Sequence, residues 1–108
     1  MNSVQLTGRL TRDPEVRYSN SGKAVASFTL AVDRQYKSNE QTADFINCKA
    51  FDKNAEFIEK YFCKGKKMEL VGFIQTGSYT NKDRVKVYTT DVIAQSVAFA
   101  ESKSTESR

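Results

Sequence analysis

The chain has 108 residues, 39% of them hydrophobic, and a formal net charge of +4, which predicts one folded domain with a small core and favours an acidic partner. It has no histidine, which excludes Ser–His and Cys–His nucleophile activation, and it shows no phosphate-binding glycine motif or metal-ligand spacing, so we expect no enzyme, cofactor or metal. No apolar run nears the roughly 20 residues that cross a bilayer, and the alternating start does not resemble a signal peptide, so we expect a cytoplasmic protein with no membrane partner.

Three segments in the first half alternate between apolar and polar residues with the period of a β-strand. They are Val4–Leu10, Ala24–Val32 and Phe45–Phe51. Asp13-Pro14-Glu15 interrupts the pattern after the first segment, and Ser19–Gly22 predicts a turn before the second. The sequence therefore predicts three strands, with a polar hairpin loop at residues 37–42 between the last two.

The period of the pattern changes after the third strand. From Asn54 to Phe62 the apolar residues fall at helical spacing, which predicts a helix whose aromatic residues serve packing. Asp52 is the expected N-cap of this helix, and Lys64-Gly65 is its expected C-terminal end.

Two further strands follow the helix. The first is predicted by the alternating residues Met68, Leu70, Gly72 and Ile74. Gly77–Thr80 extends beyond it, Asn81–Asp83 predicts a turn, and Arg84–Ala98 forms the last strand. Residues 101–108 are predicted to be a flexible C-terminal tail.

The resulting order of elements predicts an all-β domain over residues 1–100. Three strands, a helix and two strands is the order of the OB-fold, a five-stranded Greek-key barrel with one helix between strands 3 and 4. OB-folds bind oligonucleotides or oligosaccharides on their second and third strands and in the 1–2 and 4–5 loops. Other small barrels share this order of elements.

The third strand carries rings on its more polar side. Phe45, Asn47, Lys49 and Phe51 share one parity, whereas the alternate positions within Ile46–Ala50 are typical of core. One interpretation buries the two rings under a second layer, and another reverses the parity through a bulge. The third interpretation is a flat surface on which nucleic-acid bases stack while the lysine contacts phosphate.

Other rings and cations extend this third interpretation. Tyr36 ends the second strand and Tyr79 lies on the 4–5 arm, although either can be an ordinary loop tyrosine. The candidate phosphate-binding cations are Lys37, Lys49, Lys53, Lys64, Lys82 and Arg84, with Arg9 and Lys86 as further candidates. Single lysines are uninformative, but the four rings on one expected face favour sequence-tolerant binding of single strands.

Several short motifs follow one another along the chain. They are Asn2-x-Val4-x-Leu6-x-Gly8-Arg9-Leu10, Asp13-Pro14-Glu15-Val16-Arg17-Tyr18, Gly22-x-x-Val25-Ala26-x-Phe28-Thr29-Leu30-Ala31-Val32, Asp44-Phe45-Ile46-Asn47-Cys48, Phe51-x-Lys53-x-Ala55-Glu56, Tyr61-x-x-Lys64-Gly65, Gly72-x-Ile74-Gln75-Thr76-x-Ser78-Tyr79 and Val87-Tyr88-Thr89-Thr90-Asp91-Val92. Through them the chain resembles, from about residue 2 to 99, the bacterial and phage single-stranded DNA-binding proteins of the homotetrameric OB-fold type.

This resemblance implies a function and a set of site residues. The chain is expected to bind single-stranded DNA as a homotetramer associated with the nucleoid, and to protect it in replication, recombination, repair or DNA uptake. The resemblance implies stacking by Tyr36, Phe45, Phe51 and Tyr79. It also implies subunit contacts through the first strand and the sheet surfaces, and it places Lys53 and Lys64 near the DNA path.

The chain departs from the family pattern in three places. It has no tryptophan, which relatives often carry at three of the four ring positions, so weaker stacking is expected. Gly77-Ser78 stands where relatives have basic residues, which leaves Lys82 and Arg84 as partial substitutes. The sequence ends at Arg108 without the acidic, Phe-terminated tip of many relatives, so partners of that tip are not supported, and both a trimmed chain and a short paralogue fit.

Three other functions compete with single-strand binding. An OB-fold adaptor would use the aromatic face to bind protein in a replication or recombination complex. A cold-shock-like RNA-binding barrel would carry an RNP-type motif, which is absent from the sequence. A nuclease is disfavoured because no acidic cluster or catalytic base is found in the sequence.

Overall fold

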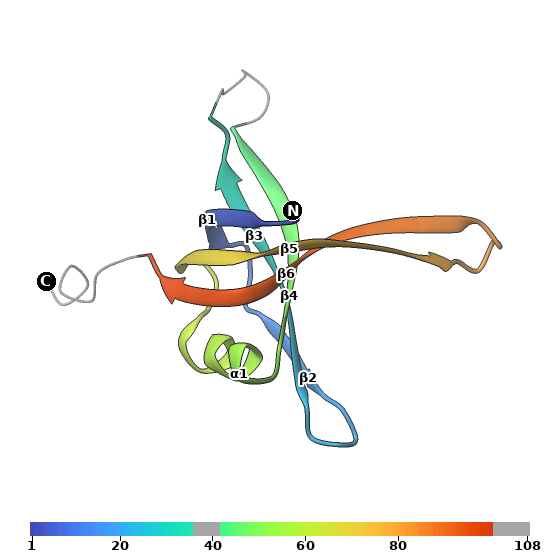
Figure 1. The fold of residues 1–108 in the computed structure, drawn as a ribbon, viewed down its shortest axis with the longest axis horizontal. Coiled ribbons are helices and arrows are strands. Elements are labelled where there is room, and N and C mark those ends of the chain that lie inside the picture. Colours follow the sequence, from blue (N-terminus) through green and yellow to red (C-terminus); the bar gives the residue numbers. More distant parts are fainter. Residues whose placement is uncertain (36–41, 101–108) are drawn as a thin grey trace, which may run out of the picture.

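The computed structural model describes residues 1–35 and 42–100, which form six strands and one helix (Figure 1). In chain order the elements are β1 (Val4–Leu10), β2 (Glu15–Tyr18), β3 (Ala24–Asp33), β4 (Ala43–Phe51), α1 (Asp52–Tyr61), β5 (Lys67–Thr80) and β6 (Lys86–Phe99). The five predicted strands and the helix are confirmed. The short β2 was not predicted, because four residues after a proline are too few for a clear alternation.

Five of the strands close into a ring. Their order is β1-β5-β6-β4-β3, and β1 pairs back to β3 through Arg9↔Ala31 and Leu10↔Leu30. All neighbours are antiparallel except β4 and β6, which meet in parallel at Cys48↔Val92 and Lys49↔Ile93. A closed five-stranded barrel with a helix between its third and fourth strands is the OB-fold, which confirms the predicted fold class. β2 lies outside this ring, paired to β3.

The inward residues of the barrel strands form the core. Leu10, Leu30, Met68 and Leu70 are almost completely buried inside it. Helix α1 covers one end of the barrel because Ala55 and Ile58, three residues apart, fall on one helical face, and both are fully buried.

Aromatic packing fastens the helix to the last strand. The ring of Phe99 lies 5.5 Å from that of Phe57 and 5.1 Å from that of Phe62, which confirms the packing role predicted for the helix aromatics. The predicted N-cap was wrong, because Phe51 occupies the N-cap position without a capping side chain, and Asp52 is the first helical residue at φ 54°. The helix ends at Tyr61, earlier than Lys64-Gly65.

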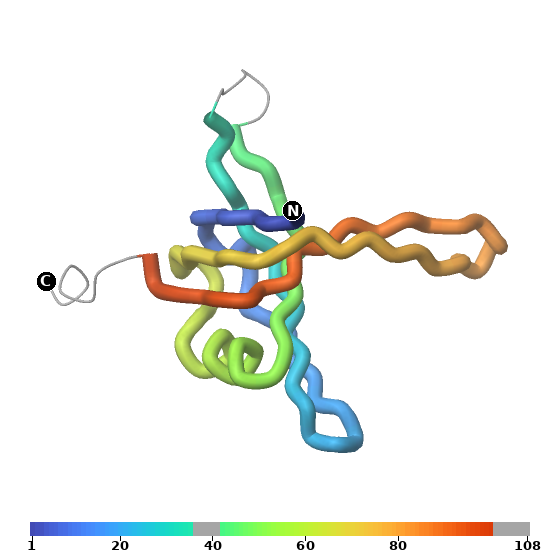
Figure 2. Tube along the Cα trace, viewed as in Figure 1, coloured from blue at the N-terminus to red at the C-terminus, as the bar shows by residue number. Residues whose placement is uncertain are grey.

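Three two-stranded extensions, β2–β3, β3–β4 and β5–β6, radiate from the barrel (Figure 2). The β5–β6 arm continues in register to Thr80↔Lys86 and is closed by a turn in which the Asn81 side chain accepts hydrogen bonds from the backbone of Asp83 and Val85. Ile74 is 44% exposed because β5 has left the barrel there. The Asn2 side chain makes two hydrogen bonds to the Ile74 backbone. Its Nδ2 donates to the Ile74 carbonyl oxygen, and its Oδ1 accepts from the Ile74 N–H.

Candidate nucleic-acid interface

The outer face of β4 carries the aromatic and lysine side chains that the alternation placed there. Phe45 is 65% exposed and Phe51 42% exposed, with Asn47 and Lys49 exposed between them. The alternate residues turn inward, and Cys48 is buried in the core. The interpretations that buried both rings or reversed the parity are therefore wrong for this chain. The two rings lie about 20 Å apart along the strand, at roughly 3.3 Å per residue.

Strand β3 runs beside these rings and places Val25 opposite Phe51. In the antiparallel pairing, Ala31 lies opposite Phe45 and Ser27 lies opposite Lys49, and opposite residues share a face. Thr29 lies opposite Asn47, and its hydroxyl donates a hydrogen bond of 3.1 Å to the Asn47 side-chain oxygen. The floor between the rings is therefore low and polar, so the rings stand above it.

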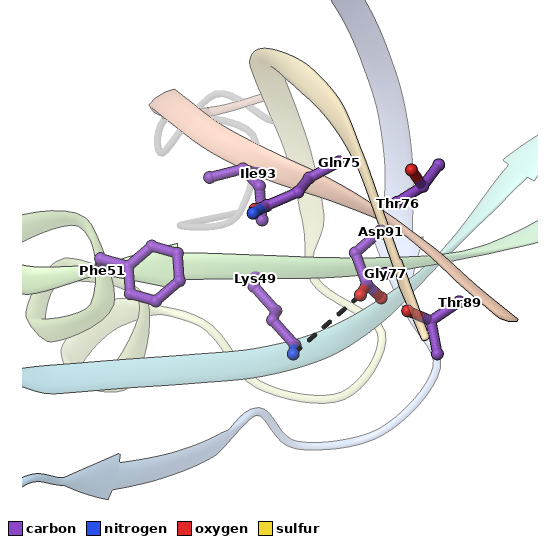
Figure 3. A pocket seen from close by; sticks show the side chains of 8 residues that line it. All are labelled: Lys49, Phe51, Gln75, Thr76, Gly77, Thr89, Asp91 and Ile93. Atoms are coloured by element: carbon purple, nitrogen blue, oxygen red, sulfur yellow. Dashed lines mark ion pairs between the residues drawn. The ribbon is translucent and has the colours of Figure 1, made fainter. Parts of the chain in front are cut away.

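A shallow depression connects β4 to the base of the arm (Figure 3). We call it the central depression, and its lining consists of Lys49, Phe51, Gln75, Thr76, Gly77, Thr89, Asp91 and Ile93. Inside it the Lys49 Nζ lies 4.0 Å from an Asp91 carboxylate oxygen (Figure 3). An anion that approaches Lys49 must therefore compete with Asp91.

Tyr79 lies on the arm face that continues from the central depression. The register pairs Gln75 with Asp91, Gly77 with Thr89, and Tyr79 with Val87. Tyr79 therefore shares a face with these first four residues, all of which line the depression. The Tyr79 residue is 57% exposed. The structure thus brings Phe45, Phe51 and Tyr79, three of the four predicted rings, onto one continuous surface.

The remaining predicted cations are spread around this surface. Lys53 is exposed in the first turn of α1, two positions after Phe51 in the sequence, and Lys82 and Arg84 are exposed in the turn at the arm tip. Lys64 is exposed in the loop after α1, where its backbone N–H donates to Asp13, away from the lining of the central depression. The predicted Tyr36 and Lys37, and most of the predicted hairpin loop, lie outside the described residues.

Sequence reasoning missed three residues of this region. Asp91 was not singled out, although its pairing with Lys49 defines the charge of the depression. Arg17 lies on β2 opposite Val25, where its exposed guanidinium pairs with Glu15 at 2.7 Å. Tyr88 is 75% exposed on β6. Counting strand positions from the Asn81–Asp83 turn would have predicted the outward position of Tyr88. The role of Asp91 could not be predicted in this way, because its pairing with Lys49 depends on the contact between β4 and β6.

Neither cysteine lines the central depression. Burial, together with a smaller effect of the nearby Asp91 carboxylate, raises the pKa of the Cys48 thiol to about 12, so the thiol stays protonated. Cys63 is an exposed free thiol. Within residues 1–35 and 42–100, no group of three or more side chains could hold a metal ion. In the same ranges no helix is long and apolar enough to cross a membrane.

A closed five-stranded barrel whose outer face presents rings and cations defines the class of oligonucleotide-binding OB-fold proteins. Comparison with protein families gives the particular group. The model of the Single-strand binding protein family matches residues 1–100, and the chain belongs to this family.

Three bacterial relatives show the extent of the similarity. The chain is 53% identical over 107 residues to the single-stranded DNA-binding protein of Fusobacterium nucleatum subsp. nucleatum, covering 95% of this chain and 69% of the relative. It is 52% identical to the single-stranded DNA-binding protein of Clostridium perfringens, covering 94% and 67%. It is 48% identical to single-stranded DNA-binding protein 1 of Staphylococcus aureus strain MSSA476, covering 98% and 69%. The chain therefore spans about two thirds of the length of these relatives.

Proposed function

We propose that this protein binds single-stranded DNA without sequence preference and protects it during replication, recombination, repair or DNA uptake. One observation carries the proposal: Phe45, Phe51 and Tyr79 are exposed on one continuous surface that also holds Lys49. Membership of the Single-strand binding protein family and the names of its relatives support the same conclusion.

The proposed mechanism is passive and uses two kinds of contact. Bases stack on the rings Tyr36, Phe45, Phe51 and Tyr79, at roughly 1–3 kcal/mol per base. Phosphates are held by the cations Lys37, Lys49, Lys53, Lys64, Lys82 and Arg84. Because every base has a π-face, stacking tolerates any sequence. A strand held in this way cannot re-pair with its complement.

We also propose that the protein assembles as a homotetramer and is associated with the nucleoid in the cytoplasm. The outer faces of β1 and β5 support this assembly, because Gln5 lies opposite Val71 and Thr7 lies opposite Glu69 on a surface separate from the central depression. Val71 is 39% exposed there, as expected of an apolar residue that a second subunit covers.

A titration of the whole protein with oligothymidine and with duplex DNA tests the function. The chain has five tyrosines and no tryptophan, so quenching of tyrosine fluorescence reports binding directly. We expect single strands to bind tighter than duplex by orders of magnitude, because paired bases do not offer free faces. Equal affinity for the two would contradict the stacking mechanism, and weak binding of both would favour a protein adaptor.

A further inference from the structure

The β5–β6 arm has a second exposed face that the proposed binding surface does not use. Tyr79 pairs with Val87 and faces the side of the central depression, whereas Tyr88 pairs with Ser78 and faces the opposite side. We call the opposite side the far face of the arm. Its exposed residues, read from β5 and then β6, are Ile74, Thr76, Ser78, Thr80, Lys86, Tyr88 and Thr90. Among these seven residues, Thr76 at the base of the arm also lines the central depression.

The far face is composed differently from the face that carries Tyr79. The near face includes the carboxylate of Asp91, which holds Lys49 at 4.0 Å. The seven far-face residues include a lysine, a tyrosine and four hydroxyl residues, and no carboxylate occurs among them. The arm tip adds Lys82 and Arg84, with Asp83 as the acid between them. An anionic partner is therefore favoured on this face.

The far face holds a ring and a cation at a distance that suits a nucleotide. Tyr88 is 75% exposed, and the Lys86 Nζ lies 5.3 Å from the centre of its ring. The two residues are two positions apart on one strand, so both side chains leave the same side of the arm. A ring that presents a π-surface beside an ammonium group can stack a base while the cation meets an adjoining phosphate.

A protein partner fits this face less well than a nucleic acid does. The only large apolar residues of the far face are Ile74 and Tyr88, and about 13 Å of strand separates Ile74 from Ser78, the residue opposite Tyr88. Protein interfaces rely on clustered apolar anchors in a desolvated centre, which two separated residues cannot form. Scattered hydroxyls with a cation are instead typical of contacts to phosphate and sugar.

We propose that the far face of the arm is a second track for single-stranded DNA, in which a base stacks on Tyr88 and Lys86 contacts the neighbouring phosphate. The inference rests on the proposed function and extends it. A strand leaving Tyr79 passes the Lys82 and Arg84 turn and returns along the far face. A short oligonucleotide fills the near face only, whereas a long one engages both faces.

The test compares Tyr88→Ala, Tyr88→Leu and Tyr88→Phe with the unmodified protein on a short and a long oligothymidine. We expect Tyr88→Ala to bind the long strand about five- to tenfold more weakly, near the lower part of the range for one stacked base. Binding of the short strand should be unchanged. Tyr88→Phe should restore binding because it keeps the ring, and Tyr88→Leu should not because it keeps only apolar area. Lys86→Gln should reduce the magnitude of the log–log salt slope by about 0.7 on the long strand.

Two controls separate the possible failures. Phe51→Ala should weaken binding of both strands, so loss of that effect would contradict the proposed function itself. If Phe51→Ala weakens both while Tyr88→Ala leaves the long strand unaffected, only the second track is overturned. Light scattering without DNA tests whether a second copy of the chain, rather than DNA, binds the far face. A changed oligomeric state in Tyr88→Ala would assign the far face to a contact between copies of the chain and would also overturn the second track.

Discussion

Phe51 lies where three parts of the molecule meet. It ends β4, occupies the N-cap position of α1 and lines the central depression. Its ring is partly exposed and is not one of the buried core side chains. Phe51 is therefore placed to contact a ligand without supporting the core.

Replacing Phe51 with alanine is expected to weaken single-strand binding by more than tenfold, because one stacked base is lost. Fluorescence titration with oligothymidine measures the loss, and urea unfolding of the same variant measures its stability. Phe28→Ala is the matched control, because that ring is 4% exposed in the core and its loss should reduce stability instead. Unchanged binding would show that Phe51 does not contact the strand, and a variant that simply unfolds would show that the ring supports the core. Either result contradicts the site.

Asp91 lies beside Lys49, and both residues line the central depression. Its side chain is only 22% exposed, and it lies 4.0 Å from the Lys49 Nζ. Removing its charge should leave Lys49 free for phosphate, so Asp91→Asn is expected to bind single strands several-fold tighter at low salt. The measurement is the dissociation constant at a series of salt concentrations.

A mutant cycle tests whether the effect of Asp91 passes through Lys49. In a Lys49→Gln background, Asp91→Asn should change affinity much less than it does alone. Glu56→Gln removes an exposed carboxylate on the helix and controls for net charge. An equal gain from Glu56→Gln would show that only the total charge matters, and the assigned pairing would be wrong.

At the scale of elements, β5 and β6 run through both the barrel and the arm, but the space available for side chains differs between the two parts. β5 and β6 pack closely inside the barrel, where the register shifts between Val71 and Gly72. A Cβ atom on Gly72 would lie 1.9 Å from the backbone oxygen of Ile93, so no side chain fits there. On the arm, a Cβ on Gly77 would meet only the Thr89 hydroxyl, at 3.2 Å.

Gly72→Ala is therefore expected to destabilise the fold by about 1–3 kcal/mol or more, because the backbone of β6 must move. Gly77→Ala is the matched control in the same strand, and its effect should be small because the Thr89 side chain can rotate. Urea unfolding monitored by circular dichroism compares the two midpoints. Equal midpoints would mean that β5 and β6 do not approach as closely as the structure places them.

At the scale of the whole molecule, the positive charge is distributed rather than concentrated. The net charge is +4, and the candidate cations come from β4, the helix, the loop after it and the arm tip. Such a distribution suits a strand that wraps over the surface, since each phosphate meets its own cation.

If about five cations per subunit contact phosphate, the affinity for single strands should fall with salt at a log–log slope of about −3.5 per subunit, at roughly −0.7 per contact. Titrations over a series of salt concentrations give the slope. Ring substitutions should then dominate at high salt and lysine substitutions at low salt. A slope near zero would remove phosphate contacts from the mechanism.

Local pattern in the sequence determined most of the elements and the outward position of Phe45 and Phe51. The reason is physical: side chains alternate across a strand, so the inward run ending at Cys48 and Ala50 sets the opposite direction for its neighbours. The change to helical spacing after Asp52 likewise placed α1 between the third and fourth barrel strands, and that order predicted the OB-fold.

Only the tertiary structure decided which distant residues meet. Lys49 and Asp91 are 42 positions apart and come together because β4 and β6 pair in parallel when the barrel closes. The same closure decided that Ile74 lies outside the core and that Tyr79 shares a surface with Phe51. Such contacts depend on the register between strands far apart in the chain, which no local alternation of residues specifies.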